Sequence, residues 1–174
     1  QRTRIAGESQ RIEVIDLKVV LHLDFSHEES DGRFFEGSVT QALPGIRVKG
    51  VENHPYPIEH AMESVKGDLV LAPYEKLPFA DGQFDFVMAY AAIYMLNLGG
   101  VMQALREIQR VGKGRSFVTL GAYKTREGRE LLEEWTLLGT TILHVDEWLE
   151  VFRETGYTGD YAFTTAESLN LVRG

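Results

Sequence analysis

Hydrophobic runs with the period of a strand alternate along this chain with stretches that have the period of a helix. The first strand is predicted at 12–17, and the apolar run continues through 18–25 as either strand or helix. Further strands are predicted at 46–51, 68–71, 84–89 and 116–120, helices at 57–65, 101–111, 125–138 and 146–155, and a C-terminal antiparallel hairpin at 161–164 and 169–172. The alternation predicts βαβ units, and therefore an α/β fold with a mostly parallel sheet.

Start and stop signals support three of these helices. The helix at 101–111 carries apolar residues three and four positions apart on one face, and Gly112 follows its end. Thr125 and Asp146 are predicted as the N-caps of the next two helices, and Gly156 is predicted to end the last one.

Size and composition place the chain among ordinary globular proteins. Its 174 residues fit one domain, and the hydrophobic share is 44% with 25% charged residues. The net charge of -8 disfavours a nucleic-acid partner, because such binding depends on Lys and Arg that neutralise phosphates. No apolar run is long enough to span a bilayer, 1–10 has no signal-peptide core, and there is no cysteine. We therefore expect a cytoplasmic protein with no membrane partner.

Two segments carry the clearest motifs. The run 77–87, LPFADGQFDFV, resembles the LPF-x-D-x-x-F-D-x-V signature of S-adenosylmethionine (SAM)-dependent methyltransferases of the small-molecule and ubiquinone-biosynthesis type. The run 104–113, ALREIQRVGK, is similar to the A-L-x-E-I-x-R-V-x-K helix of the same family, and Gly50-Val51-Glu52 resembles the end of its second strand. The resemblance extends from about Glu13 to the C-terminus. It implies a Rossmann-like class I methyltransferase fold, with one domain over 1–174 and SAM as cofactor. Taken by themselves, the aromatic residues of the first motif are core positions and Asp81-Gly82 is ordinary turn chemistry.

The chain departs from the family where a glycine turn should follow the first strand. The family pattern is roughly V-L-D-x-G-x-G-x-G, and Val14–Leu17 matches only its start, because no glycine occurs before Gly32. The simplest interpretation is a deletion at Leu17–Lys18, with the turn lost or absent from the given sequence, and 21–25 resembling the following helix. Bulky Val19 and Val20 in the cofactor space would favour a relative that no longer binds SAM.

The resemblance assigns candidate cofactor-binding residues to the ends of the strands. Glu52 would accept hydrogen bonds from the ribose diol, or would be a solvated strand-end carboxylate. Asp16 would support the cofactor edge, and Asn53 would line the same pocket or form a turn. Tyr74 would stack on the adenine or fill its space, and the backbone near Ala91 would border the adenine and methyl sites.

Candidate catalytic chemistry is sparse. Tyr94 occupies the histidine position of the family's S-x-x-x-x-H-x-L segment, where it would orient a substrate, act as an acid, or only pack at a helix start. The His and acidic residues at 22–31 match no metal motif, so no metal is expected.

The function predicted is SAM-dependent methylation of a small-molecule substrate. The alternative is a non-catalytic binding or assembly module that has lost SAM, and a nucleotide-binding protein is disfavoured because no phosphate-cradling loop is evident. One face of the predicted helix at 125–138 carries an apolar stripe, which we interpret as part of the core. If that face is exposed, it would instead form a homodimer surface. The stripe consists of Leu131, Leu132, Trp135 and Leu138.

Overall fold

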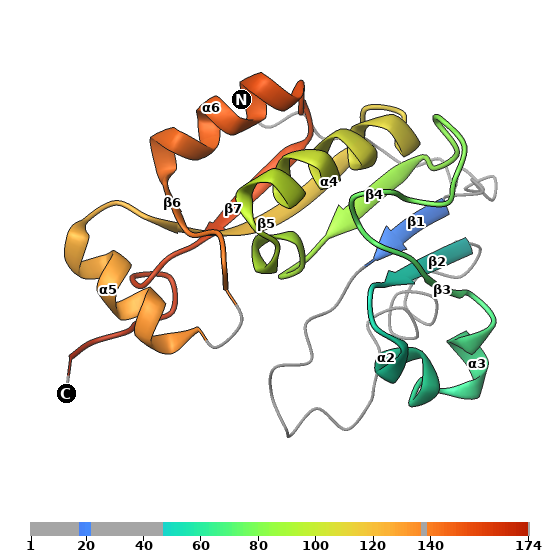
Figure 1. Ribbon diagram of the computed structural model, residues 1–174, viewed down its shortest axis with the longest axis horizontal. Coiled ribbons are helices and arrows are strands. Elements are labelled where there is room, and N and C mark those ends of the chain that lie inside the picture. The colour runs from blue at the N-terminus through green and yellow to red at the C-terminus, as the bar shows by residue number, and fades with distance from the viewer. Residues whose placement is uncertain (1–17, 22–46, 137–138, 174) are drawn as a thin grey trace, which may run out of the picture.

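A computed structural model of the protein describes residues 18–21, 47–136 and 139–173 (Figure 1). Its strands form one seven-stranded sheet in the order β3-β2-β1-β4-β5-β6, with β7 also pairing β5. The strands are β1 (Lys18–Leu21), β2 (Arg47–Glu52), β3 (Leu69–Leu71), β4 (Phe86–Ala89), β5 (Ser116–Tyr123), β6 (Leu143–His144) and β7 (Asp160–Thr164). The helices are α2 (Pro55–Glu59), α3 (Glu63–Lys66), the 3-10 helix η1 (Ile93–Met95), α4 (Leu98–Val111), α5 (Arg126–Trp135) and α6 (Val145–Thr155). The predicted α/β class with a parallel sheet is confirmed.

The central strand β1 joins the two halves of the sheet. Val20 pairs with Lys49 of β2 on one side and with Val87 of β4 on the other, both in parallel. Lys18–Leu21 is a strand, which is one of the two alternatives predicted for the apolar run 18–25. The backbones of Val19 and Val20 pair with β2 on one side and with β4 on the other. The glycine turn of the family would follow Leu21, where residues 22–46 lie outside the described part of the chain, as does the predicted strand at 12–17.

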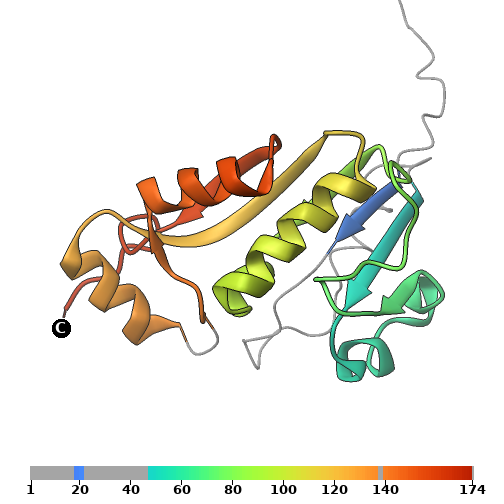
Figure 2. The same cartoon turned by 45° about the horizontal axis from the view of Figure 1, so that its top comes forward.

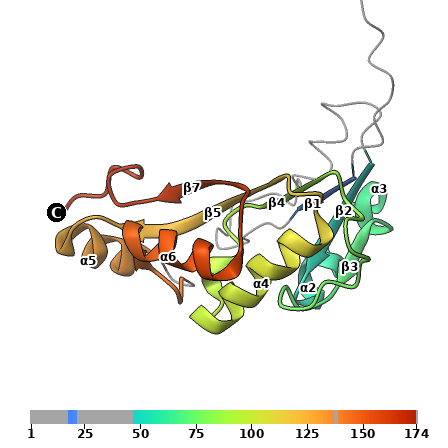
Figure 3. The ribbon, with the colours of Figure 1, turned by 90° about the horizontal axis from the view of Figure 1, so that it is seen from above.

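Helices α4 and α6 lie side by side on one face of the sheet (Figures 2 and 3). The predicted apolar face of α4 is confirmed, because Val101, Leu105 and Val111 are completely buried. Trp148 of α6 is also fully buried, and its indole Nε1 donates to the Gly121 carbonyl oxygen of β5 at 2.9 Å. This hydrogen bond satisfies the indole N–H, so the largest side chain can occupy the core without an unmet donor.

Several helix boundaries differ from the predicted ones. The single helix predicted at 57–65 is divided into α2 and α3, because the chain leaves helical geometry at Met62 (ψ 139°), the N-cap of α3. Helix α6 is capped by His144 instead of Asp146, since His144 Nδ1 accepts from the Asp146 N–H and Glu147 accepts from the His144 N–H. The Thr125 cap of α5 is confirmed by its hydrogen bond from the Gly128 N–H at 3.0 Å.

The predicted C-terminal antiparallel hairpin is not confirmed. Strand β7 pairs in parallel with β5, from Phe117 opposite Asp160 to Gly121 opposite Thr164. The residues that follow form turns, because Thr165 and Ser168 exchange hydrogen bonds between side chain and backbone. These local bonds compete with a strand ladder for the same backbone groups.

Three further features of the described residues are the apolar stripe of α5, the close packing of Gly159 and the length of the helices. On α5, Leu132 is 2% exposed and lies in the core, whereas Leu131 is half-buried and Trp135 is 41% exposed; Leu138 lies outside the described residues. Gly159, before β7, packs so closely that a Cβ would stand 2.7 Å from the Ser116 carbonyl oxygen. Within the described ranges, none of the helices has the length and apolar character to cross a membrane.

Candidate functional site

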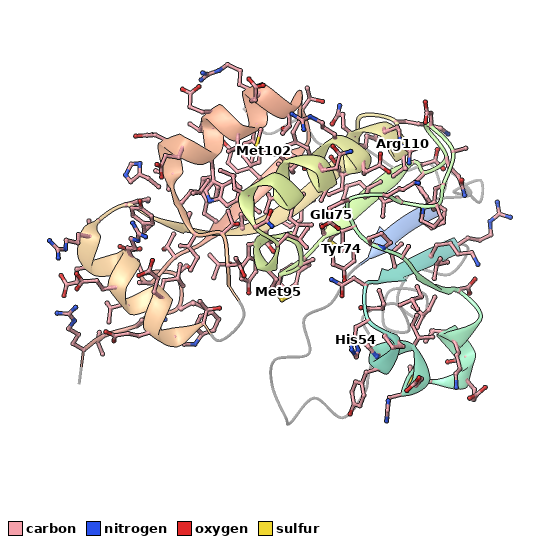
Figure 4. The ribbon with its side chains drawn as sticks, in the orientation of Figure 1. His54, Tyr74, Glu75, Met95, Met102 and Arg110 are labelled. Carbon is pink, nitrogen blue, oxygen red and sulfur yellow. The ribbon has the colours of Figure 1, made fainter. Side chains whose placement is uncertain are left out.

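The candidate site lies at the carboxyl ends of β1, β2 and β4. The strand order runs outward from β1 to β2 on one side and to β4 on the other, so the connections diverge between β1 and β4. Ligands of open parallel sheets bind at such a switch point, outside the carboxyl ends of the strands. Figure 4 shows Tyr74 and Glu75 between α4 and the strands β1 and β2, with Met95 near the start of α4 and His54 at the start of α2.

Glu52 is the last residue of β2 and lies inside the protein. The residue is 2% exposed, and its backbone carbonyl accepts from the Ala72 N–H at 2.9 Å, which joins the ends of β2 and β3. The interpretation of Glu52 as a solvated strand-end carboxylate is therefore wrong. A buried carboxylate costs free energy unless polar groups surround it. Asn53, the next residue, is exposed in the bend that precedes α2.

Tyr74 lies in the apolar interior beside this edge. The residue is 5% exposed and lines an apolar cavity of about 30 Å3 together with Val51, Val87 and Ala92, among others. Val51 precedes Glu52 and Ala92 follows Ala91, so the cavity is bordered by residues at the ends of both β2 and β4. A ring buried to this extent offers little free face for stacking, so the geometry agrees better with Tyr74 as a wall of the site.

Ala91 has the most unusual backbone at this edge. It follows β4, and its φ of +52° lies in the left-handed region, which only one other non-glycine residue among those described adopts. Its N–H donates to Thr119 Oγ1 of β5 at 2.6 Å. Left-handed alanine is strained, and such strain occurs preferentially at functional sites.

Tyr94 lies on the other side of this segment, in η1. The residue is 9% exposed, and its ring lies near Gly121 and Gly139, whose added Cβ atoms would stand 3.8 and 3.2 Å from it. Its carbonyl oxygen accepts from the N–H groups of Thr140 and Thr141, which binds the loop after α5 to η1. The role of Tyr94 as an acid stays a prediction, and its contacts are those of a packed residue.

The sequence motifs at 77–87 and 104–113 meet at the opposite, amino-terminal edge of β4. Arg110 forms a bidentate pair with Glu107, with Nε and Nη2 at 2.8 and 2.7 Å from the carboxylate oxygens. It also donates to the carbonyl oxygens of Phe79 (2.7 Å) and Leu77 (3.0 Å) and to Asp81 (2.8 Å). Glu107 in turn accepts from the Leu77 N–H at 2.8 Å. We call this group of residues the Arg110 clamp.

The clamp stabilises the loop before β4 and does not contribute to the site. Glu107 is 8% exposed, and its pKa lies below the usual value because Arg110 donates hydrogen bonds to it. The pKa of Arg110 is raised for the same reason. Lys113 pairs with Asp85 at 2.6 Å beside it. The motif that predicted the family is therefore structural.

The remaining candidates are placed less fully. Asp16 and the His-rich run 22–31 lie outside the described residues. Over the ranges that the structure describes, no three His or acidic residues lie close enough to hold a metal ion. Thr119 was not found by sequence reasoning, because a threonine in a buried strand carries no signal of its own.

A known family accounts for this arrangement. The family model described as "Methyltransferase domain" matches residues 34–120, which is half of the chain. The chain belongs to the methyltransferase domain family. No curated protein matches the sequence.

Solved structures show how widely the fold of this methyltransferase domain occurs. A protein from Haloferax volcanii, solved in complex with the methyltransferase activator Trm112, is 23% identical with a TM-score of 0.58, and the match covers 81% of this chain and 61% of that one. A SAM-dependent methyltransferase from Thermotoga maritima is 20% identical with a TM-score of 0.52, covering 80% and 63%. The [4+2]-cyclase SpnF is 18% identical with a TM-score of 0.58, covering 82% and 52%. The chain thus spans between about half and two thirds of these proteins, and the likeness concerns the fold alone.

Proposed function

We propose that this methyltransferase domain binds SAM at the carboxyl edge of β1, β2 and β4 and methylates a small molecule. Two observations at this edge carry the proposal: Glu52 is a buried carboxylate at the end of β2, and Ala91 is a strained residue after β4, on the other side of β1. Both flank the switch point, which is where nucleoside ligands bind in open parallel sheets.

The residues at this edge suit the chemistry of SAM. A carboxylate can accept two hydrogen bonds from a ribose diol, which is the task proposed for Glu52. Tyr74, Val51 and Ala92 offer an apolar wall of the kind that surrounds a base. Asn53 follows Glu52 in the chain and is exposed, and we propose that it lines the same pocket.

SAM supplies a methyl group already activated on a sulfonium sulfur, so the protein's task is mainly alignment and exclusion of water. This chemistry explains why the edge needs no general base for transfer to proceed.

The surface beside the edge supports a small organic acceptor. Leu71, the last residue of β3, is 54% exposed, and Tyr90, directly after β4, is 51% exposed. Apolar and aromatic side chains next to a few polar groups are typical of small-molecule sites. The net charge of -8 argues against a nucleic-acid substrate.

Calorimetric titration with SAM and with its demethylated product tests the proposal. We expect binding by the wild type and affinity lower by about 10- to 100-fold in Glu52→Gln, since hydrogen bonds to a charged group contribute about 1.5–3 kcal/mol. The matched control is Glu63→Gln, because the Glu63 side chain is 90% exposed on α3 and should not affect binding.

The same titration can refute the proposal. If a folded wild-type protein binds neither ligand, the domain is not a SAM-dependent enzyme, and the non-catalytic alternative replaces it. If Glu52→Gln and Glu63→Gln bind SAM equally well, Glu52 does not hold the ribose.

A further inference from the structure

The chain leaves β4 through a conformation that alanine does not adopt readily. Ala91 has φ +52°, and the residues after it are among the most buried in the protein, with Ala92 1% and Ile93 2% exposed. A strained residue persists only where its surroundings hold it more strongly than the strain opposes them. The contacts of Ala91 therefore identify what sets the shape of this edge.

One side chain contributes the polar contact that holds Ala91. Thr119 Oγ1 accepts from the Ala91 N–H at 2.6 Å, and Thr119 is 6% exposed. The position of Thr119 is fixed by the sheet, because the preceding residue, Val118, pairs with Ala89 of β4. The hydroxyl is thus held by a rigid strand one step beyond the end of the β4 ladder.

The far side of the segment is fixed independently. The Tyr94 carbonyl oxygen accepts from Thr140 and Thr141 at 3.1 and 2.8 Å, and Thr141 Oγ1 donates to the Leu96 carbonyl oxygen at 2.6 Å. The segment 91–96 is therefore bound at its start by Thr119 and at its end by the loop after α5. Without Thr119, only the start would be free to relax, and the start is the part that borders the switch point.

We propose that Thr119 is a positioning residue of the cofactor site, which holds Ala91 in the left-handed conformation that shapes the end of β4. This inference rests on the proposed function, because it concerns the affinity for SAM. Thr119 acts through Ala91 and contributes no group to the reacting atoms. Thr119→Val keeps the size and removes the acceptor, so Ala91 relaxes and the edge changes shape.

Calorimetric titration of SAM into the full chain tests this role. We expect Thr119→Val to weaken binding about tenfold, which the loss of one hydrogen bond suffices to cause. Thr119→Ser keeps the acceptor and should bind as the wild type does. Adding Ala91→Gly to Thr119→Val should restore most of the affinity, because glycine adopts positive φ without strain and no longer needs the hydroxyl.

A matched control separates this role from general destabilisation. Thr155 in α6 is also buried, at 8% exposed, and its hydroxyl donates to the Val151 carbonyl oxygen at 2.8 Å within the same helix. Thr155→Val should lower the free energy of unfolding and leave SAM affinity unchanged.

The outcomes distinguish the two proposals. If the wild type binds SAM and Thr119→Val binds it equally tightly, the positioning role is overturned and the proposed function stands. A glycine variant that fails to rescue affinity would also overturn it. A folded wild type that binds no SAM would overturn both.

Discussion

Replacement of Arg110 with alanine removes every hydrogen bond of the Arg110 clamp that the guanidinium supplies. It leaves the buried carboxylate of Glu107 with the Leu77 N–H as its donor, and deprives the carbonyl oxygens of Leu77 and Phe79 of the guanidinium. Loss of one partner of a buried ion pair costs about 3–5 kcal/mol. Because the Arg110 side chain is 31% exposed, water replaces part of the loss, so we expect about 2–4 kcal/mol. Asp81 adds little, since its side chain is 83% exposed.

Urea unfolding at pH 7 measures this loss directly. Arg110→Lys should retain part of the stability, because it keeps the charge but not the planar fork that meets both oxygens of Glu107. The control is Arg153→Ala, which breaks an ion pair with Glu150 whose side chains are 69% and 68% exposed and should change stability within the error of measurement.

The pH dependence provides a second test of the clamp. The pKa of Glu107 is lowered in the folded protein, so its contribution is present above the unfolded value near 4.5 and is lost as pH falls through the lower folded pKa. The difference between the wild type and Arg110→Ala should therefore be full at neutral pH and shrink in acid. A difference that is small at pH 7, or equal to that of Arg153→Ala, would refute the reasoning.

Three further predictions concern the packing of Gly159 and Trp148 and the ionisation of Tyr157. Gly159→Ala should destabilise the fold strongly in thermal unfolding, because its Cβ would stand 2.7 Å from a backbone oxygen, whereas Gly67→Ala meets nothing within 4 Å and should be neutral or stabilising. Trp148→Phe should cost about 1–3 kcal/mol in urea, since it leaves the Gly121 carbonyl oxygen without its donor. Burial raises the pKa of Tyr157 to about 12. The stability that the neutral phenol contributes should therefore fall as pH rises from 10 through 12. Denaturant titration at alkaline pH measures this loss.

The sequence predicted the fold well where the signal was local. The helical spacing in α4 and the motif before β4 reflect packing that the chain carries in its own order, and both are confirmed. The C-terminal hairpin was not confirmed because the side chains of Thr165 and Ser168 each accept from the other's backbone N–H, a competition that hydrophobic patterning does not register.

The site was harder to predict because its parts come from separate strands. Glu52 was recognised by its place after β2, but its burial depends on segments that lie far away in the sequence. The bond from Ala91 to Thr119 joins residues 28 positions apart, and neither residue type is unusual at its position. The family's glycine turn was expected after Leu17, whereas Lys18–Leu21 is a strand and the residues after Leu21 lie outside the described part of the chain.

The central place of β1 has a consequence for the order of folding. It pairs with β2 and β4, and it is the one described strand that connects the β3-β2 side with the β4-β5-β7 side. Val20 and its partner Val87 are 67 positions apart, so a ribosome adding about 5–20 residues per second needs about 3–13 seconds to supply that partner. During synthesis the central strand therefore keeps one edge unpaired until β4 has been made. Newly made chains would be most vulnerable to aggregation, and most dependent on chaperones, in that interval.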